Sequence, residues 1–380
     1  MSKTASALAK GLAIIMMLFH HLFYSTETIS AHVGAGGFSS FPLSEASLVN
    51  VAQSFKICVA VFVFITAYGT FRQLDAKGLI SERGARLCER YSIEHVVKLL
   101  AGFWCVFVLA QAVALLVGVP SHWAGSVYGG NGVIAGIAYF LIDGLGLSSA
   151  LGTPSLNATW WYMSLAILLI FLVPVLIKTS RLIGGWALLA MSALIPLLAG
   201  WELGRSLWWY LPSACAGIAC AQYDTFERLL AMLRSERHAA PKALVLALLL
   251  AVLLVVRRRI GMEFALDALA AFLVCLLSCV LEKTVARAPL CFLGAHSMNI
   301  FLLHTFIYDY FFGSAIYSLV WFPFILLALL AASLLCSVLI EAAKRAVGFS
   351  LKAERAATAV SHGLCAVRQK YDDSAEMTAA

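Results

Sequence analysis

The chain has 380 residues, of which 62% are hydrophobic and only 12% are charged. Soluble domains carry about 25% charged residues, so this composition leaves too little polar surface to cover a water-soluble globule. The net charge of +7 could indicate an anionic partner, but most of it borders predicted membrane spans, which argues against nucleic-acid binding.

Hydropathy predicts an all-α fold, a polytopic transmembrane helical bundle of about ten spans. A span needs ~20 mostly apolar residues, and such stretches recur along most of the chain. The predicted transmembrane domain covers 1–345, and no secondary structure is assigned to the polar tail at 346–380. The ten predicted spans lie near 8–24, 51–71, 95–119, 159–177, 182–200, 206–222, 242–256, 264–281, 297–312 and 320–341.

The placement of Lys and Arg predicts the topology. With a cytoplasmic N-terminus, 22 of the 27 Lys and Arg residues fall on cytoplasmic segments, as the positive-inside rule requires. We therefore expect a multi-pass protein of the cell (plasma or inner) membrane with both termini in the cytoplasm and with segments 25–50 and 120–158 outside. The run Arg257–Arg259 does not fit, because alternation places it outside. Asp267, in the eighth span, is expected to pair with one of these arginines.

The first predicted span holds two residues with chemical potential, Lys10 and His21. They are eleven residues apart, which puts them on one helix face with ~16 Å of rise between them. Lys10 is expected at the cytoplasmic boundary and His21 near the bilayer centre. A histidine inside a span is a functional candidate, and a neutral imidazole can accept a proton from an alcohol. The alternative is an interhelical hydrogen bond, which we expect for His20 because it points ~100° away.

Lys10 and His21 fit the Arg/Lys-x10-His motif of the acyltransferase-3 family of multi-pass membrane acyltransferases. Further stretches resemble the family in the same order, across most of the chain. The second-span pattern departs at its end, where Ala67 stands at the usual glycine. The matching stretches are the second-span pattern at 59–68, an Arg-x-x-Arg motif at 83–86, a Trp-Trp-Tyr stretch leading to a proline at 160–174, and a stretch at 293–304 that contains Gly294 and Ser297 and ends at His304.

The resemblance implies a membrane-embedded acyltransferase. Such enzymes move an acyl group, commonly acetyl, from cytoplasmic acyl-CoA to a hydroxyl of a sugar or cell-surface glycan. Acyl-CoA (acetyl-CoA) is then the donor substrate, the glycan and the lipid bilayer are the other partners, and no metal is required. His21 would be the general base, with Lys10 as the second catalytic residue. Transient acylation of His21 stays open as a variant.

Arginines near the third span are the candidates for binding CoA. CoA is polyanionic, and a guanidinium binds phosphate through a planar fork of donors. Arg83 and Arg86 are three residues apart and share a helix face, which Arg90 continues by another turn. The alternative is topological charge in contact with lipid headgroups.

Three further residues are candidates for contacting the acceptor. His304, about mid-span, could orient His21 or face the acceptor, or make an interhelical hydrogen bond. Trp161 could stack on a sugar or belong to the interfacial aromatic belt. Lys56 could contact the acceptor or snorkel. Asp143 and Glu45, in the external segments, could hydrogen-bond a sugar, but we expect them to be solvated.

Two other function classes stay open. A proton- or substrate-coupled transporter would also place His and Lys inside spans, although inverted repeats would be expected with it. A sensory or scaffold module would not need an Arg-x-x-Arg motif below a buried histidine. The ten Cys residues show no spacing typical of a metal site or a disulfide framework.

Overall fold

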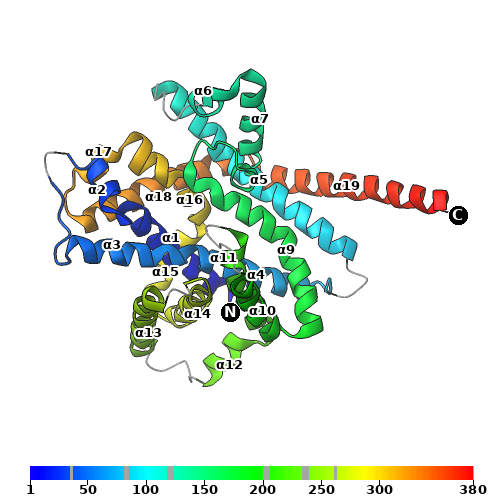
Figure 1. Ribbon diagram of the computed structural model, residues 1–380, viewed down its shortest axis with the longest axis horizontal. Helices are drawn as coiled ribbons and strands as arrows, with labels where there is room; N and C mark the ends of the chain where they lie inside the picture. The colour runs from blue at the N-terminus through cyan, green and yellow to red at the C-terminus, as the bar shows by residue number, and fades with distance from the viewer. Residues whose placement is uncertain are drawn as a thin grey trace. The chain divides into compact units, whose positions relative to one another are not determined.

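The computed structural model describes residues 1–34, 37–80, 85–117, 124–199, 206–232, 239–260 and 263–379. These residues form a helical protein (Figure 1), in which an isolated bridge between Ser39 and Trp321 is the only β pairing. The predicted all-α fold is therefore confirmed.

Seven described helices are long and apolar enough to cross a membrane, or up to eight if one bent pair counts as a span. The predicted spans all fall on helices. Two of them, at 182–200 and 206–222, correspond to helices of only 14 and 16 residues, short of the ~20 residues that a perpendicular span needs. The seven are Lys3–Phe23, Glu45–Ala76, Cys88–Leu116, Ala158–Ile183, Ala239–Ile260, Glu263–Leu281 and Phe322–Ala346, and the bent pair is Arg287–Ala295 with Ser297–Phe311.

The chain divides into two compact units. The first unit comprises 1–71 and 176–338, and the second comprises 72–175 and 339–380. Helices α4 (Cys58–Ala76), α9 (Trp161–Ile183) and α18 (Phe322–Ala346) each contribute to both. The first unit also contains α1 (Lys3–Phe23), α2 (Thr26–His32), α3 (Glu45–Ser54), η1 (Phe55–Ile57), α10 (Gly185–Leu198), α11 (Leu207–Gln222), α12 (Thr225–Met232), α13 (Ala239–Ile260), α14 (Glu263–Leu281), α15 (Arg287–Ala295), α16 (Ser297–Thr305), η6 (Phe306–Phe311) and α17 (Gly313–Tyr317).

Helix α1 is central to the first unit, where it packs against α3, α14, α15 and α16. The Ser2 hydroxyl accepts a hydrogen bond from the backbone N–H of Ala5 and so caps the first turn. Two glycines set the contact with α15. A methyl group on Gly11 would overlap the carbonyl of Leu290, and one on Gly294 would overlap the carbonyl of Ala7. Glycine thus permits a close helix approach of the kind common in membrane bundles.

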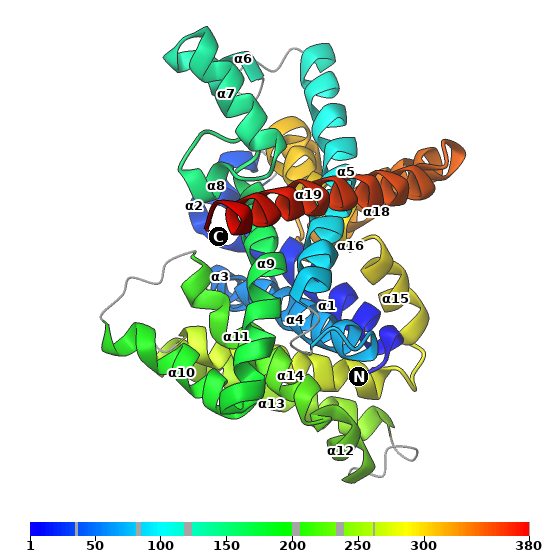
Figure 2. The ribbon, with the colours of Figure 1, turned by 90° about the vertical axis from the view of Figure 1, so that its right-hand side faces the viewer.

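In the second unit, α5 (Ala85–Val117) packs against the C-terminal helix α19 (Phe349–Ala379), as Figure 2 shows. Small residues of α19, Ala357 and Ser361, are fully buried. The Ser361 hydroxyl also donates to Glu94 of α5 at 3.2 Å. The tail to which no secondary structure was assigned therefore contains a helix.

The rest of the second unit is organised around Asp143. This residue lies near the end of α7 (Val133–Gly144), and its side chain is 1% exposed. Its carboxylate accepts hydrogen bonds from Tyr128, from Ser148 and from the backbone N–H of Leu156. Burial raises the pKa of the Tyr128 hydroxyl, with the Asp143 charge as the second cause. The expectation of a solvated Asp143 is wrong. The remaining elements of this unit are α6 (Ala124–Tyr128), η4 (Gly129–Asn131), α8 (Ser148–Leu151) and η5 (Ala158–Trp160).

Candidate active site

One face of α1 carries both Lys10 and His21. At 100° per residue, Ile14 and Met17 lie on the same face between them. Both of these apolar side chains are buried, with exposures of 0% and 4%. The face with the two polar groups is therefore turned into the first unit and away from its surroundings.

The bounds of α1 set the positions of the two residues along the helix. The helix begins at Lys3 and ends at Phe23, so His21 lies in its last turn, whereas Lys10 lies inside it. From the sequence we expect Lys10 at the cytoplasmic boundary and His21 near the bilayer centre, and these depths in the membrane stay predictions.

His304 lies beside His21. The centres of the two imidazole rings are 4.8 Å apart, although 283 positions separate them in the chain. The His304 side chain is fully buried. Its Nδ1 lies 2.7 Å from the carbonyl oxygen of Phe301. A carbonyl can only accept, so Nδ1 carries a hydrogen. In the neutral ring Nε2 is then an acceptor, with the Thr305 hydroxyl 3.4 Å away.

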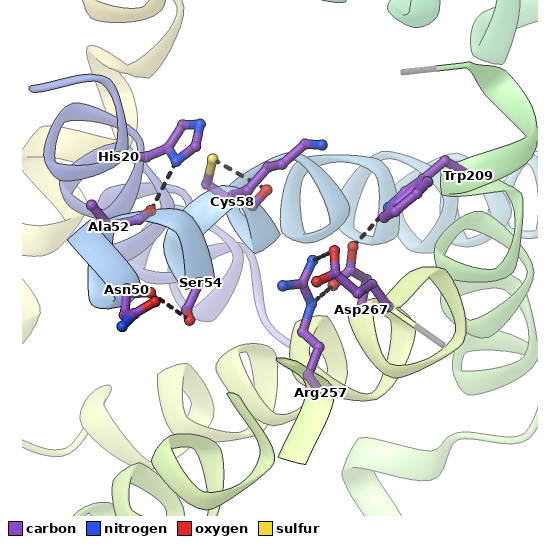
Figure 3. Close-up of polar contacts among 10 residues, drawn as sticks. His20, Asn50, Ala52, Ser54, Cys58, Trp209, Arg257 and Asp267 are labelled. Atoms are coloured by element: carbon purple, nitrogen blue, oxygen red, sulfur yellow. Dashed lines mark hydrogen bonds and ion pairs between the residues drawn. The ribbon is translucent and has the colours of Figure 1, made fainter. Parts of the chain in front are cut away.

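His20 behaves as expected for a structural histidine. Its Nδ1 donates to the carbonyl oxygen of Ala52 in α3 at 2.8 Å (Figure 3). The bond joins α1 to α3. The ring centre of His20 is 5.1 Å from that of His21, so the two neighbouring imidazoles share one end of α1 but serve different contacts.

The side chain of Lys10 is half-buried. Among the residues that the structure describes, none forms a hydrogen bond or an ion pair with its ammonium group. A cation in an apolar helix without an internal partner can receive an anion from outside the chain.

Lys56 belongs to a charged cluster that we call the Arg257 cluster, formed by Lys56, Trp209, Arg257, Glu263 and Asp267. Figure 3 shows Trp209 and Arg257 on either side of Asp267. The Lys56 ammonium lies 5.0 Å from the centre of the Trp209 ring, whose N–H donates to Asp267 at 2.9 Å. Arg257 donates through Nε to Asp267 and through Nη2 to Glu263 at 3.1 Å.

The Arg257 cluster confirms the predicted pairing of Asp267 with the arginine run. The side chains of Arg257 and Asp267 are each 1% exposed. Arg257 is therefore a buried partner in an ion pair and not a loop charge, which explains why it does not follow the positive-inside pattern.

The remaining predicted residues belong to the second unit. Arg90, in α5, donates to Glu94 at 3.0 Å, a pair one turn apart. Arg86 lies in α5, but its side chain is outside the described residues, as is the whole of Arg83. Trp161 is half-buried at the start of α9, with its ring centre 6.2 Å from that of Tyr162. The roles assigned to these residues stay predictions.

The π-helix η6 begins two residues after His304 and was not predicted from the sequence. Its Tyr308, four residues after His304, stacks on the His304 ring with 6.0 Å between ring centres. Aromatic residues four apart on a helix are a signal that could have suggested this contact. Across the described residues, no group of three or more His, Cys, Asp or Glu side chains is arranged to hold a metal ion.

A family model described as an acyltransferase domain matches residues 5–342, which include most of α1, the histidine pair and most of the second unit. No curated protein and no solved structure matches the chain. Because the family model covers most of the sequence, the chain belongs to the acyltransferase-3 family and is a membrane acyltransferase.

Proposed function

We propose that the protein transfers an acyl group, commonly acetyl in this family, from cytoplasmic acyl-CoA to a hydroxyl of a sugar or cell-surface glycan. His21 is the general base. Lys10, Arg83 and Arg86 bind the donor, with Arg90 adding a weaker contact. The protein works in the cell membrane with both termini in the cytoplasm.

The observation that carries this proposal is the contact between His21 and His304. A base must be held so that its lone pair meets the proton it removes. Nε2 of the buried His304 is an acceptor once Nδ1 is bound to Phe301. A neutral His21 whose N–H points toward His304 turns its other nitrogen toward the acceptor hydroxyl. This is the usual arrangement of a base oriented by a third group.

In the reaction, the acceptor hydroxyl oxygen attacks the thioester carbonyl carbon of acyl-CoA, and His21 takes the hydroxyl proton. The new C–O bond forms as the C–S bond breaks. CoA leaves as a thiolate, which takes up a proton, and His21 returns to its neutral form. Lys10 supports this step because its ammonium has no partner among the described residues and can contact an anionic donor.

Two residues remain as candidates for contacting the acceptor. Trp161 offers an aromatic face on which a sugar ring can stack, since it is half-buried at a helix start. Lys56 offers an ammonium, although this group already lies over the ring of Trp209. His304, beside the base, is closest to the chemistry and is assigned the orienting role.

The test compares His21→Ala with His20→Ala in matched membrane preparations, measuring acyl-CoA consumption. We expect His21→Ala to lose activity by about 10²–10⁴-fold, the typical contribution of a general base. His20→Ala removes an interhelical hydrogen bond, worth on average about 0.6 kcal/mol in membranes, and should retain activity. Full activity in His21→Ala would remove the proposed base and favour a transporter.

A further inference from the structure

A second histidine pairs with a carboxylate at the same end of the first unit. His32 is the last residue of α2, and Asp309 lies in the π-helix η6. Nε2 of His32 is 3.1 Å from Oδ1 of Asp309, and Nδ1 is 3.0 Å from the carbonyl oxygen of Thr28. The imidazole also stacks on the ring of Tyr317, with 5.3 Å between centres and 15° between planes.

Both ring nitrogens of His32 have an oxygen acceptor beside them. The Thr28 carbonyl can only accept, so Nδ1 of His32 carries a hydrogen. Nε2 faces the Asp309 carboxyl group. The imidazole is therefore held from α2 on one side and from η6 on the other.

The pair is connected to the histidine site by two short paths. Asp309 lies in the π-helix that begins directly after Thr305 and thus follows His304 along the chain. On the other side, the hydroxyl of Tyr317, on which His32 stacks, donates to the carbonyl oxygen of Leu22 at 2.7 Å. Leu22 is the residue after His21. The pair of His32 and Asp309 is therefore linked both to α1, which carries His21, and to the helix that carries His304.

Three side chains from η6 and α17 contact His32. Asp309 and Tyr308 approach it from η6, with 6.4 Å between the ring centres of His32 and Tyr308. Tyr317 approaches from α17. Burial raises the pKa of Tyr317, so its hydroxyl stays protonated and its bond to Leu22 persists.

We propose that His32 is a positioning residue for acyl transfer. The imidazole of His32, held by Asp309, fixes η6 against α2 and so sets the distance between His304 and His21. This inference rests on the proposed function. A π-helix is rare and occurs mostly at functional sites, and the contact of His32 with Asp309 holds this one in place.

The test uses the full-length protein in membranes and three variants. His32→Gln and Asp309→Asn remove the ion pair, and His32→Arg restores a permanent cation whose planar group can stack on Tyr317. Glu45→Gln, which removes an exposed carboxylate of α3, is the control. Acyl-CoA consumption is measured for the wild type and for each variant in matched membrane preparations.

We expect Glu45→Gln to match the wild type. His32→Gln and Asp309→Asn should each be about tenfold less active, below the roughly 10²-fold that a full ångström of misplacement can cost. His32→Arg should keep most of the activity, because its guanidinium can still bond to Asp309. Wild-type activity in His32→Gln and Asp309→Asn, or a loss in His32→Arg as large as in His32→Gln, would overturn the proposal.

Hydrogen–deuterium exchange separates this inference from the proposed function. Protection of α2 and η6 should fall in His32→Gln and Asp309→Asn but not in His32→Arg. That result would stand even if His21→Ala kept full activity. Unchanged protection in His32→Gln and Asp309→Asn would overturn the proposal, even if His21 proved to be the base. The two substitutions remove opposite partners of the same pair, so either one tests the proposal if the other prevents folding.

Discussion

Lys10 and Arg257 are both cations inside apolar helices of the first unit, and they differ in what surrounds them. Arg257 is 1% exposed and lies between two carboxylates, those of Glu263 and Asp267. Lys10 is half-buried, and no described residue pairs with it. Burial of a charge is costly unless it is paired. The chain satisfies Arg257 internally, and we propose that Lys10 binds an external anion.

The comparison separates two meanings of an intramembrane charge. A polar residue in a span is a functional candidate by default. This rule does not distinguish a residue that stabilises the fold from one that binds a ligand. In the Arg257 cluster, every charged group has a partner inside the unit, and we assign it to folding. Lys10 has no partner among the described residues, and we propose a functional role for it and for His21, which lies on the same face.

The largest effect on stability is expected from Asp267→Asn. The change leaves Arg257 buried with one carboxylate in place of two, and removing one partner of a buried pair costs about 3–5 kcal/mol. We expect a strong loss of folded protein, measured as thermal unfolding in detergent and as yield from membranes.

The matched control replaces the pair with apolar residues, Arg257→Met with Asp267→Leu. Such replacements are often neutral or stabilising, so the double variant should recover the stability lost in Asp267→Asn while the enzyme stays active. Loss of acyl transfer in a stable double variant would show that the Arg257 cluster is needed for activity and not only for folding.

Lys10→Ala should reduce acyl-transfer activity and leave thermal stability unchanged, which is the opposite of the effect expected from changes in the Arg257 cluster. A charge-assisted contact is worth about 1.5–3 kcal/mol, so the variant should lose activity by about tenfold to a hundredfold with its thermal unfolding unchanged. Lys10→Arg should retain most of the activity, because the cation is preserved and the family motif admits Arg. The measurement is the rate of acyl-CoA consumption beside a detergent melt. Lower stability with unchanged activity would show that Lys10, like Arg257, is a structural cation.

Much of the fold could be predicted because hydropathy reports directly on membrane helices. The bend between α15 and α16, 65°, could not. Proline usually causes such kinks, and none lies there. Instead, His296 and Asn299 bond to the Ser337 hydroxyl at 2.8 and 3.1 Å. A contact across about forty residues leaves no local pattern in the sequence.

The candidate site was predictable in part for the same reason. Lys10 and His21 share a face by helical spacing alone, and the buried Ile14 and Met17 show where that face turns. The contact of His21 with His304 depends on the packing of α1 against α16, which no spacing encodes. Gly294, quoted only as part of a motif, acts in packing at Ala7, so a motif residue need not touch the chemistry.

Arg90 is intermediate between Arg257 and Lys10 in its pairing, and Arg90→Gln should have the smallest effect. Its guanidinium is half-buried and already donates to one carboxylate, that of Glu94, one turn away. Helix pairs at this spacing contribute only about 0.3–0.5 kcal/mol, so stability should barely change. A remaining donor can still reach a phosphate, and we expect the KM for acyl-CoA to rise about threefold, less than the factor of ten that a full charge-assisted contact gives.

Replacing both Arg83 and Arg86 with Gln should raise that KM by at least about a hundredfold, since two such contacts are lost. If Arg90→Gln matched the double variant, the bond to Glu94 would not limit Arg90, and pairing would no longer identify a structural cation. If none of the three changes altered the KM, these arginines would be topological charges, and Lys10 alone would remain as the donor contact.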